Sequence, residues 1–232
     1  QFTTSLAAIG TALTATSFNG IPFYSDSANS SMYTHDVSAT DSTAANNTAY
    51  GFNAMDAITT GDNNVAIGCS AGGAVTTALE NTLMGSFAGD ALVSGSYNVG
   101  IGTHALGAED LGSRSTAVGY GTLTAQNVDG NVYNTAVGFL AGGAVTTGVK
   151  NTLIGGDVGV SLTIGNFNTA LGYGALNASV DGDYNTAIGY QALLSYEDGD
   201  GNGHNTAIGN QSQLNASTGE FNTSLGSSSM GS

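Results

Sequence analysis

Asn185-Thr186-Ala187-Ile188-Gly189 is the most informative segment of the chain, because the same pentapeptide pattern returns along the chain at a nearly constant interval. Its first residue recurs at eleven anchor positions: Asn47, Asn64, Asn81, Asn98, Ser115, Asn134, Asn151, Asn168, Asn185, Asn205 and Asn222. The interval is 17 residues eight times, and 19 and 20 residues once each. Such a period indicates a stack of similar structural units.

The two longer intervals occur at the same place in a larger repeat of four coils. One four-coil block starts at Asn64 and the next at Asn134. Both open with a coil that contains Ala-Gly-Gly-Ala-Val-Thr-Thr, at residues 71–77 and 141–147. We therefore interpret the two blocks as copies of one duplicated unit.

The pentapeptide predicts a short strand that ends in a corner. Its fifth residue is Gly in all eleven coils, which indicates a backbone with positive φ or a close approach of chains. Its fourth residue is always apolar and its second is Thr or Val. Because side chains alternate along a strand, these two share one face, and the Asn, the small third residue and the Gly share the other. We expect the Thr and apolar side chains to form the buried face.

A second short apolar piece follows each corner, as in Ala105-Leu106 and Ala175-Leu176. Two short strands and two turns in 17 residues are typical of one coil of a β-solenoid. The sequence thus predicts an all-β fold, a parallel β-solenoid (β-roll) of about eleven 17-residue coils. Coils stacked at a strand spacing of roughly 4.8 Å would form a rod on the order of 50 Å long. The anchor Asn side chains, present in ten of eleven coils, would form a ladder of amide hydrogen bonds along it.

Two parts of the chain differ in regularity. Residues 47–232 form the β-solenoid repeat domain, and residues 1–46 form an N-terminal cap or junction segment. The segment 30–46 looks like one degenerate coil, because Ser30 precedes Asn47 by 17 residues. An atypical terminal unit is expected, since the last coil of a solenoid has to be covered.

Charge excludes several classes of function. The 17 acidic residues face only Arg114 and Lys150, so the formal net charge is −15. Nucleic acid is excluded as a ligand because phosphate binding needs clustered Lys and Arg. No run of 18 apolar residues is present, so we expect no membrane span. Such an acidic chain suits an extracellular fluid in which salt screens its charge.

One segment carries a candidate metal site. Asp198, Asp200 and Asn202 alternate with Gly in the inserted part of the coil after Asn185, which resembles the first half of a calcium-binding loop. The carboxylate expected at the twelfth position of such a loop is replaced by Gly209, so an acidic surface turn is the competing interpretation. Calcium is the only cofactor that the sequence suggests.

We expect no enzymatic activity. The three histidines, His35, His104 and His204, belong to different coils. The acidic pairs Glu109-Asp110 and Glu197-Asp198 are adjacent in sequence, so their carboxylates would point apart rather than flank a substrate.

The pentapeptide followed by Tyr190-Gln191-Ala192-Leu193 resembles two related families of fibrous proteins. One is the head of YadA-like trimeric autotransporter adhesins, in which Ser-Val-Ala-Ile-Gly repeats form a parallel β-roll in each of three chains. The other is the NTAxG-type repeat region of phage tail fibres. The resemblance covers residues 47–232 and implies a homotrimer, although the adhesin heads repeat with a shorter period than 17 residues.

Packing arguments also favour self-association. Coils with one large apolar residue per strand bury little surface alone, and the row of small third residues, such as Ala136 and Ala187, would let another chain approach closely. We therefore expect this row near the interfaces of a homotrimer.

The leading functional hypothesis is a structural and adhesive fibre segment of a virion, a phage tail or capsid fibre involved in host attachment. Its partners would be neighbouring fibre or virion proteins and a host surface glycan or protein. The alternative is a bacterial trimeric adhesin or a secreted surface filament subunit. Either would be extracellular, on a virion or a cell surface. A minor alternative is an ice-binding solenoid, because Thr residues recur at the second position, but their expected burial argues against it.

Overall fold

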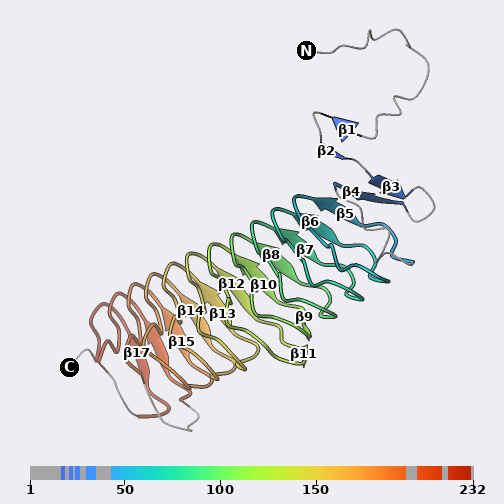
Figure 1. The fold of residues 1–232 in the computed structure, drawn as a ribbon. Helices are drawn as coiled ribbons and strands as arrows, with labels where there is room; N and C mark the ends of the chain where they lie inside the picture. Colours follow the sequence, from blue (N-terminus) through green and yellow to red (C-terminus); the bar gives the residue numbers. More distant parts are fainter. Residues whose placement is uncertain are drawn as a thin grey trace.

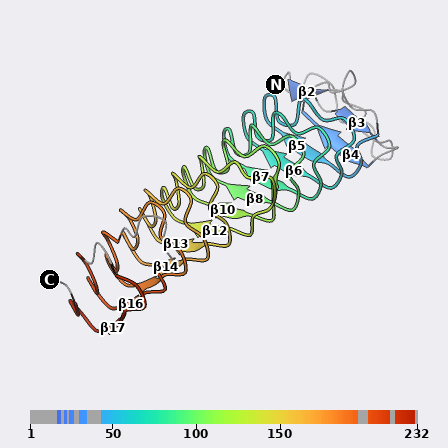
Figure 2. The same ribbon diagram turned by 90° about the horizontal axis from the view of Figure 1, so that it is seen from below.

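One long sheet of very short strands, parallel except for an antiparallel pair at its N-terminal end, runs along the whole coil stack in the computed structural model (Figures 1 and 2). The structure describes residues 17–18, 21–22, 24–26, 30–34, 43–196, 203–215 and 219–230. The sheet has the order β17-β16-β15-β14-β13-β12-β10-β8-β7-β6-β5-β4-β3. Two small sheets, β1-β2 and β11-β9, stand apart from it.

The strands are two or three residues long. Their bounds are β1 (Ser17–Phe18), β2 (Ile21–Pro22), β3 (Tyr24–Asp26), β4 (Ser31–Tyr33), β5 (Thr48–Tyr50), β6 (Val65–Ile67), β7 (Thr82–Met84), β8 (Val99–Ile101), β9 (Gly112–Ser113), β10 (Thr116–Val118), β11 (Gly130–Asn131), β12 (Thr135–Val137), β13 (Thr152–Ile154), β14 (Thr169–Leu171), β15 (Thr186–Ile188), β16 (Thr206–Ile208) and β17 (Thr223–Leu225).

The parallel β-solenoid is confirmed. Each of the eleven anchors is followed by one strand of the long sheet, and neighbouring strands pair in parallel and in register, as Thr169 with Thr186 and Leu171 with Ile188 show. The 19-residue interval is absorbed by a longer polar return, where β9 and β11 add a small parallel pair.

The expectation of a second strand in each coil is wrong. The apolar pieces after the corner form turns instead, and these turns contain residues with a left-handed backbone, with φ of 56° at Leu106 and 52° at Leu176. A chain that bends this often cannot extend as a strand. Single backbone hydrogen bonds still join successive turns, as from Leu106 N to Thr122 O (3.1 Å).

The strand β4 extends the sheet beyond the first anchor. It pairs in parallel with β5, with Met32 opposite Thr48. Ser31 rather than Ser30 takes the anchor position, and its hydroxyl accepts a hydrogen bond from Asn47 N (3.0 Å). Tyr33, fully buried, occupies the place of the small third residue. The described start of the degenerate coil is therefore one residue later than the sequence spacing suggested.

The corner glycines satisfy both conditions that the sequence predicted. Their φ values all lie between 120° and 145°, in a region that L side chains rarely adopt. At Gly138 an added Cβ would also lie 2.2 Å from the carbonyl oxygen of Gly155 in the next coil. Only glycine permits the coils to stack this closely at the corner.

The anchor side chains form the predicted ladder. Asn134 Oδ1 accepts a hydrogen bond from Asn151 N (2.8 Å), and Asn151 Oδ1 accepts from Asn168 N (2.9 Å). Most anchor amides also close their own coil, as Asn151 does by donating from Nδ2 to the carbonyl of Gly165 (2.8 Å). The anchor Asn side chains from Asn47 to Asn205 are almost completely buried.

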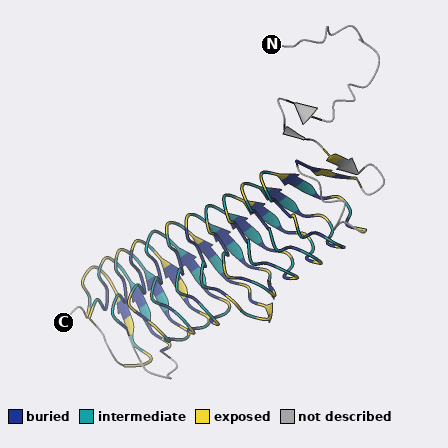
Figure 3. Cartoon of the chain, viewed as in Figure 1, coloured by how far each residue is buried: buried dark blue, intermediate teal, exposed yellow. Residues whose placement is uncertain are grey.

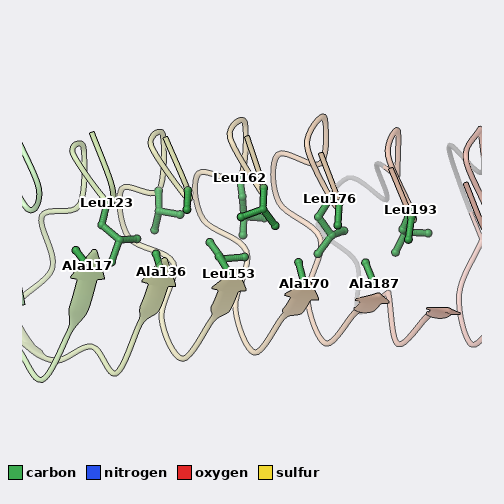
Figure 4. Packing of buried hydrophobic residues seen from close by; sticks show 14 of the residues in the cluster. Ala117, Leu123, Ala136, Leu153, Leu162, Ala170, Leu176, Ala187 and Leu193 are labelled. Carbon is green, nitrogen blue, oxygen red and sulfur yellow. The ribbon is translucent and has the colours of Figure 1, made fainter. Parts of the chain in front are cut away.

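The prediction that the Thr and apolar residues of the strand face the core is wrong. The small third residue faces it instead, and Ala117, Ala136, Ala170 and Ala187 are fully buried (Figure 4). The reason is the ladder, because the anchor Asn and the third residue share one strand face. Burial of the amides therefore turns the second and fourth residues outward.

The core is a narrow stack of strand alanines packed against leucines from the turns, such as Leu123 and Leu176 (Figure 4). In two coils the large residue lies in the strand and the small residues lie in the turns. Leu153 replaces the strand alanine, and the facing turn positions are Gly142 and Gly159. A Cβ on Gly142 would lie only 2.8 Å from Leu153 Cδ1. Leu83 with Gly72 and Gly89 repeats the exchange in the first block. Volume is thus conserved within the core.

Candidate functional site

The outward side of the long sheet is a continuous surface, here called the sheet face. It consists of the second and fourth residues of the eleven pentapeptides, which alternate with the buried third residue along each strand (Figure 3). Several of its apolar members are exposed: Tyr50, Met84, Val137, Leu171 and Leu225. Leu171, in the middle of the rod, has 44% of its surface exposed. A row of outward aliphatic side chains is unusual on a solvated surface and is typical of an interface.

Threonines form the second column of the sheet face. Seven successive coils carry them in register: Thr116, Thr135, Thr152, Thr169, Thr186, Thr206 and Thr223. Their hydroxyls make no hydrogen bond to any part of the chain that the structure describes. The face therefore offers hydrogen-bonding groups at the strand spacing beside an apolar row.

A second surface feature is the edge column, formed by the residue that precedes each anchor. Its members from the third coil onward are Glu80, Tyr97, Arg114, Tyr133, Lys150, Phe167, Tyr184, His204 and Phe221. All of these residues have a left-handed backbone conformation, with φ between 48° and 66°. Phe167, Tyr184, His204 and Phe221 stack with centroids 4.8, 4.7 and 5.0 Å apart.

Both cations of the chain belong to the edge column. Arg114 lies over the rings of Tyr97 (4.8 Å) and Tyr133 (5.9 Å), and Lys150 lies 4.8 Å from the centroid of Phe167. These cation–π contacts tie successive coils together. Because neighbouring rings cover each other's faces, the stacked rings present mainly their edges to a ligand.

A third feature is the post-corner column, formed by the residue after each corner glycine. Tyr120 stacks on Phe139 (5.5 Å), and Tyr173 stacks on Tyr190 (5.9 Å). Gly156 separates the two pairs. The Asp157 carboxylate accepts a hydrogen bond from the Tyr173 hydroxyl, which raises the pKa of Tyr173 above its ordinary value of 10.0.

A shallow groove of about 510 Å³ lies beside this column. It spans several coils and is lined by His104, Tyr120, Gly121, Thr124, Leu140, Gly143, Ala144 and Val160. One face of His104 is already stacked on Phe87, with centroids 5.3 Å apart. The lining is largely apolar and holds no side chain with a net charge, apart from the ionisable His104.

The candidate calcium ligands Asp198, Asp200 and Asn202 lie outside the described residues. Calcium at this loop therefore stays a prediction. Within the described ranges, no three His, Cys, Asp or Glu side chains come together as a metal site. His104 and His204 lie in separate ring stacks, and His35 is also outside the described residues.

Glu109, which the sequence analysis considered only as a member of the adjacent acidic pair Glu109-Asp110, is a fully buried carboxylate. Its Oε1 accepts a hydrogen bond from Gly112 N (2.7 Å), and its Oε2 accepts one from Gln126 Nε2 (2.6 Å). Burial raises the pKa of Glu109, and the hydrogen bond from Gln126 opposes this in part. Gln126 also donates to Ser115 Oγ (3.0 Å) and accepts from Asn134 Nδ2 (2.8 Å). It thereby bridges the ladder where Ser115 replaces the anchor Asn.

Sequence reasoning missed both aromatic columns. A signal was present, because aromatic residues recur immediately before the anchors and immediately after the corner glycines. Their spacing of one coil predicts stacking once the solenoid is recognised.

Comparison with known proteins returned no matching family model, no similar curated protein and no similar solved structure. Among the described residues, no helix has the length and apolar character that crossing a membrane would require.

Proposed function

We propose that this chain is a structural and adhesive fibre segment of a virion, a phage tail or capsid fibre involved in host attachment, and that it assembles as a homotrimer. The observation that carries the proposal is the sheet face, whose apolar column continues over eleven coils. A rod on the order of 50 Å long that exposes such a column gains stability by burying it against copies of itself.

The sheet face replaces the interface that the sequence suggested. The row of small third residues cannot contact another chain, because Ala136 and Ala187 are fully buried within their own coils. Leu171 and Ile188 of the sheet face point outward and are available for such a contact. A trimer in which each chain contributes this face would bury the apolar column and let the Thr hydroxyls find partners across the interface.

Assembly tests the proposal directly. We expect sedimentation equilibrium to give a particle mass near three times 22.9 kDa. Leu171→Asp and Ile188→Asp should reduce the mass to that of one chain, because each buries a charge at the interface. Tyr190→Asp, at an exposed apolar residue off the sheet, is the matched control and should stay trimeric. A native monomer, or trimers of both sheet-face variants, would contradict the proposal.

Location outside a cell, on a virion or a cell surface, is part of the same proposal. The net charge of −15 supports it, because saline fluids screen repulsion between three such chains. The alternative, a bacterial trimeric adhesin or secreted filament subunit, would use the same interface. The neighbouring genes discriminate between them: baseplate or capsid genes favour the virion fibre, and an outer-membrane anchor with an export signal favours the adhesin.

Ice binding is a second candidate, favoured by the outward orientation of the Thr column. The expected burial of the Thr column was the argument against ice binding. That argument no longer holds, because the Thr side chains lie on the outward side of the sheet. The apolar column remains uneven, because Tyr50, Met84 and Leu171 differ in size along it. A flat ordered-water template needs more uniform side chains, so the interface is the better interpretation. Thermal hysteresis in dilute solution of the chain, abolished by Thr169→Leu, would reverse this ranking.

A further inference from the structure

Between Tyr120 and Tyr190 the post-corner column lacks one ring. Four members of this segment are aromatic and exposed, with Tyr120 stacked on Phe139 and Tyr173 stacked on Tyr190. Gly156 occupies the place of the ring between the two pairs. One face of Phe139 and one face of Tyr173 are therefore turned toward the same gap, which we call the Gly156 slot.

The width of the slot suits a single six-membered ring. Phe139 and Tyr173 belong to coils two strand spacings apart, which is roughly 9.6 Å. Tyr173 leans toward Gly156, since a Cβ there would lie 3.4 Å from Tyr173 Cδ2, so the free width is somewhat smaller. A flat ring in van der Waals contact with both faces needs about 3.5–4.0 Å on each side. The slot thus accepts one ring and excludes two.

The polar groups at the slot favour a ring with hydroxyls at its rim. Asp157 follows Gly156 directly, and its carboxylate is held by the hydroxyl of Tyr173. A carboxylate beside an open slot can accept further hydrogen bonds from hydroxyl groups. A pyranose presents weakly positive C–H bonds on its faces, which suit the negative faces of aromatic rings, and hydroxyls on its rim.

We infer that the Gly156 slot binds a neutral pyranose ring of a glycan, sandwiched between Phe139 and Tyr173 with its hydroxyls toward Asp157. The inference deepens the proposed adhesive function and rests on it for its biological sense. The slot lies beyond the corner glycine and off the sheet face, so the assembly proposed above does not require these residues.

Charge restricts the class of sugar. The slot carries the Asp157 carboxylate, and the whole chain has a net charge of −15, so acidic sugars are repelled. The apolar groove beside Tyr120 gives a second surface on which a neighbouring sugar of a longer glycan can lie. Neutral oligosaccharides are therefore the ligands that the site fits best.

Closing the slot tests the inference. The probes are the methyl glycosides of galactose, glucose, mannose and N-acetylglucosamine, measured by saturation-transfer NMR on the full chain. Gly156→Tyr completes the ring column, and Gly156 does not adopt a positive φ, so the variant should fold. We expect at least one neutral glycoside to bind the native chain, and Gly156→Tyr to bind it at least about tenfold more weakly.

Two further variants sharpen the test. Ser86→Tyr introduces the same ring at the same column position three coils or more from the slot, and should bind as the native chain does. Tyr173→Phe keeps the ring face but frees Asp157, and should weaken binding less than Gly156→Tyr. Circular dichroism of Gly156→Tyr checks that the solenoid is intact.

Three outcomes would overturn the inference: no transfer to any neutral glycoside, equal transfer in native and Gly156→Tyr chains, or stronger binding of N-acetylneuraminic acid or N-acetyltyrosinamide than of every neutral glycoside. The sedimentation mass of the same samples separates this result from the proposed function. A trimer that binds no sugar refutes only the slot. A monomer that binds sugar through the slot refutes only the fibre.

Discussion

The two four-coil blocks, residues 64–133 and 134–204, build the same coils with different interiors. Their second coils agree, because Leu83 and Leu153 each fill the space left by glycines on the facing turns. Their third and fourth coils differ at one buried position. The first block places Glu109 and Gln126 there, and the second places Ser179 and Tyr196.

These two interiors show which features every coil requires. In the first block Ser115 replaces an anchor Asn, and Gln126 supplies the missing amide to the ladder. In the second block Asn185 is present, and Tyr196 fills the same position with a ring. Buried volume and an unbroken ladder are therefore conserved, whereas the residues that provide them are exchangeable.

Removing the exchanged leucines should have the largest effect. Leu83→Ala and Leu153→Ala should each lower the free energy of unfolding by about 2–5 kcal/mol, because glycines on the facing turns cannot fill the cavity. Adding Gly159→Leu to Leu153→Ala recreates the arrangement of Ala170 and Leu176, where a left-handed leucine is tolerated, and should recover part of the loss. Chemical denaturation measures all three variants.

The unfolding free energies of these variants test whether the two blocks pack in the same way. Equal losses for Leu83→Ala and Leu153→Ala would show that the duplicated blocks pack equivalently. A loss in only one block, or no recovery by Gly159→Leu, would contradict the volume exchange.

Substitutions at the corner glycines distinguish two causes of strain, the positive φ and the close approach of the next coil. Gly68→Ala and Gly138→Ala combine a positive φ with a Cβ that meets the next coil at 2.4 and 2.2 Å, so each should cost about 2–4 kcal/mol. Gly226 also has a positive φ of 120°, but a Cβ there meets nothing within 4 Å. Gly226→Ala should therefore cost only the backbone strain, about 1 kcal/mol. Equal melting shifts for all three variants would remove the close approach of coils as a cause.

The period, the corner and the ladder could be predicted from the sequence because each depends on a residue type that recurs in every coil. Gly138 and Asn151 are examples, since only glycine fits this positive φ under a neighbouring carbonyl, and the buried amide of Asn151 closes its coil. Residue type and spacing were sufficient for these features.

The side of the strand that faces the core could not be read from hydrophobicity alone. Ile188 is more apolar than Ala187, yet Ala187 is inside, because the ladder fixes the orientation and Leu193 already fills the core opposite the strand. The left-handed backbone at Leu106 and Leu176 could not be predicted for a similar reason, because the stacking of coils outweighs the preference of leucine against positive φ. The surface columns follow from these two facts.

Glu109 should give the smallest effect, a pH dependence that only the first block contributes. Its pKa in the folded chain is raised above the ordinary value of 4.5 by burial. As pH rises above 4.5, the unfolded chain releases this proton before the folded chain does, so the free energy of unfolding falls until the raised folded pKa is passed. Below 4.5 the contribution of Glu109 does not change with pH.

Transplanting the second block's interior should remove this dependence. The variant Glu109→Ser, Ser115→Asn, Gln126→Tyr carries the residues of the equivalent coils and no buried carboxylate at this position. We expect its free energy of unfolding, relative to the native chain, to increase as pH rises through the interval above 4.5. Ser179→Ala, which changes the equivalent position of the second block without a titrating group, is the control and should parallel the native chain. Because Asp90 also has a pKa raised by burial and is present in all three chains, the difference between the curves isolates Glu109. Parallel curves for the transplanted and native chains would mean that Glu109 keeps its ordinary pKa, and that its three hydrogen bonds compensate fully for its burial.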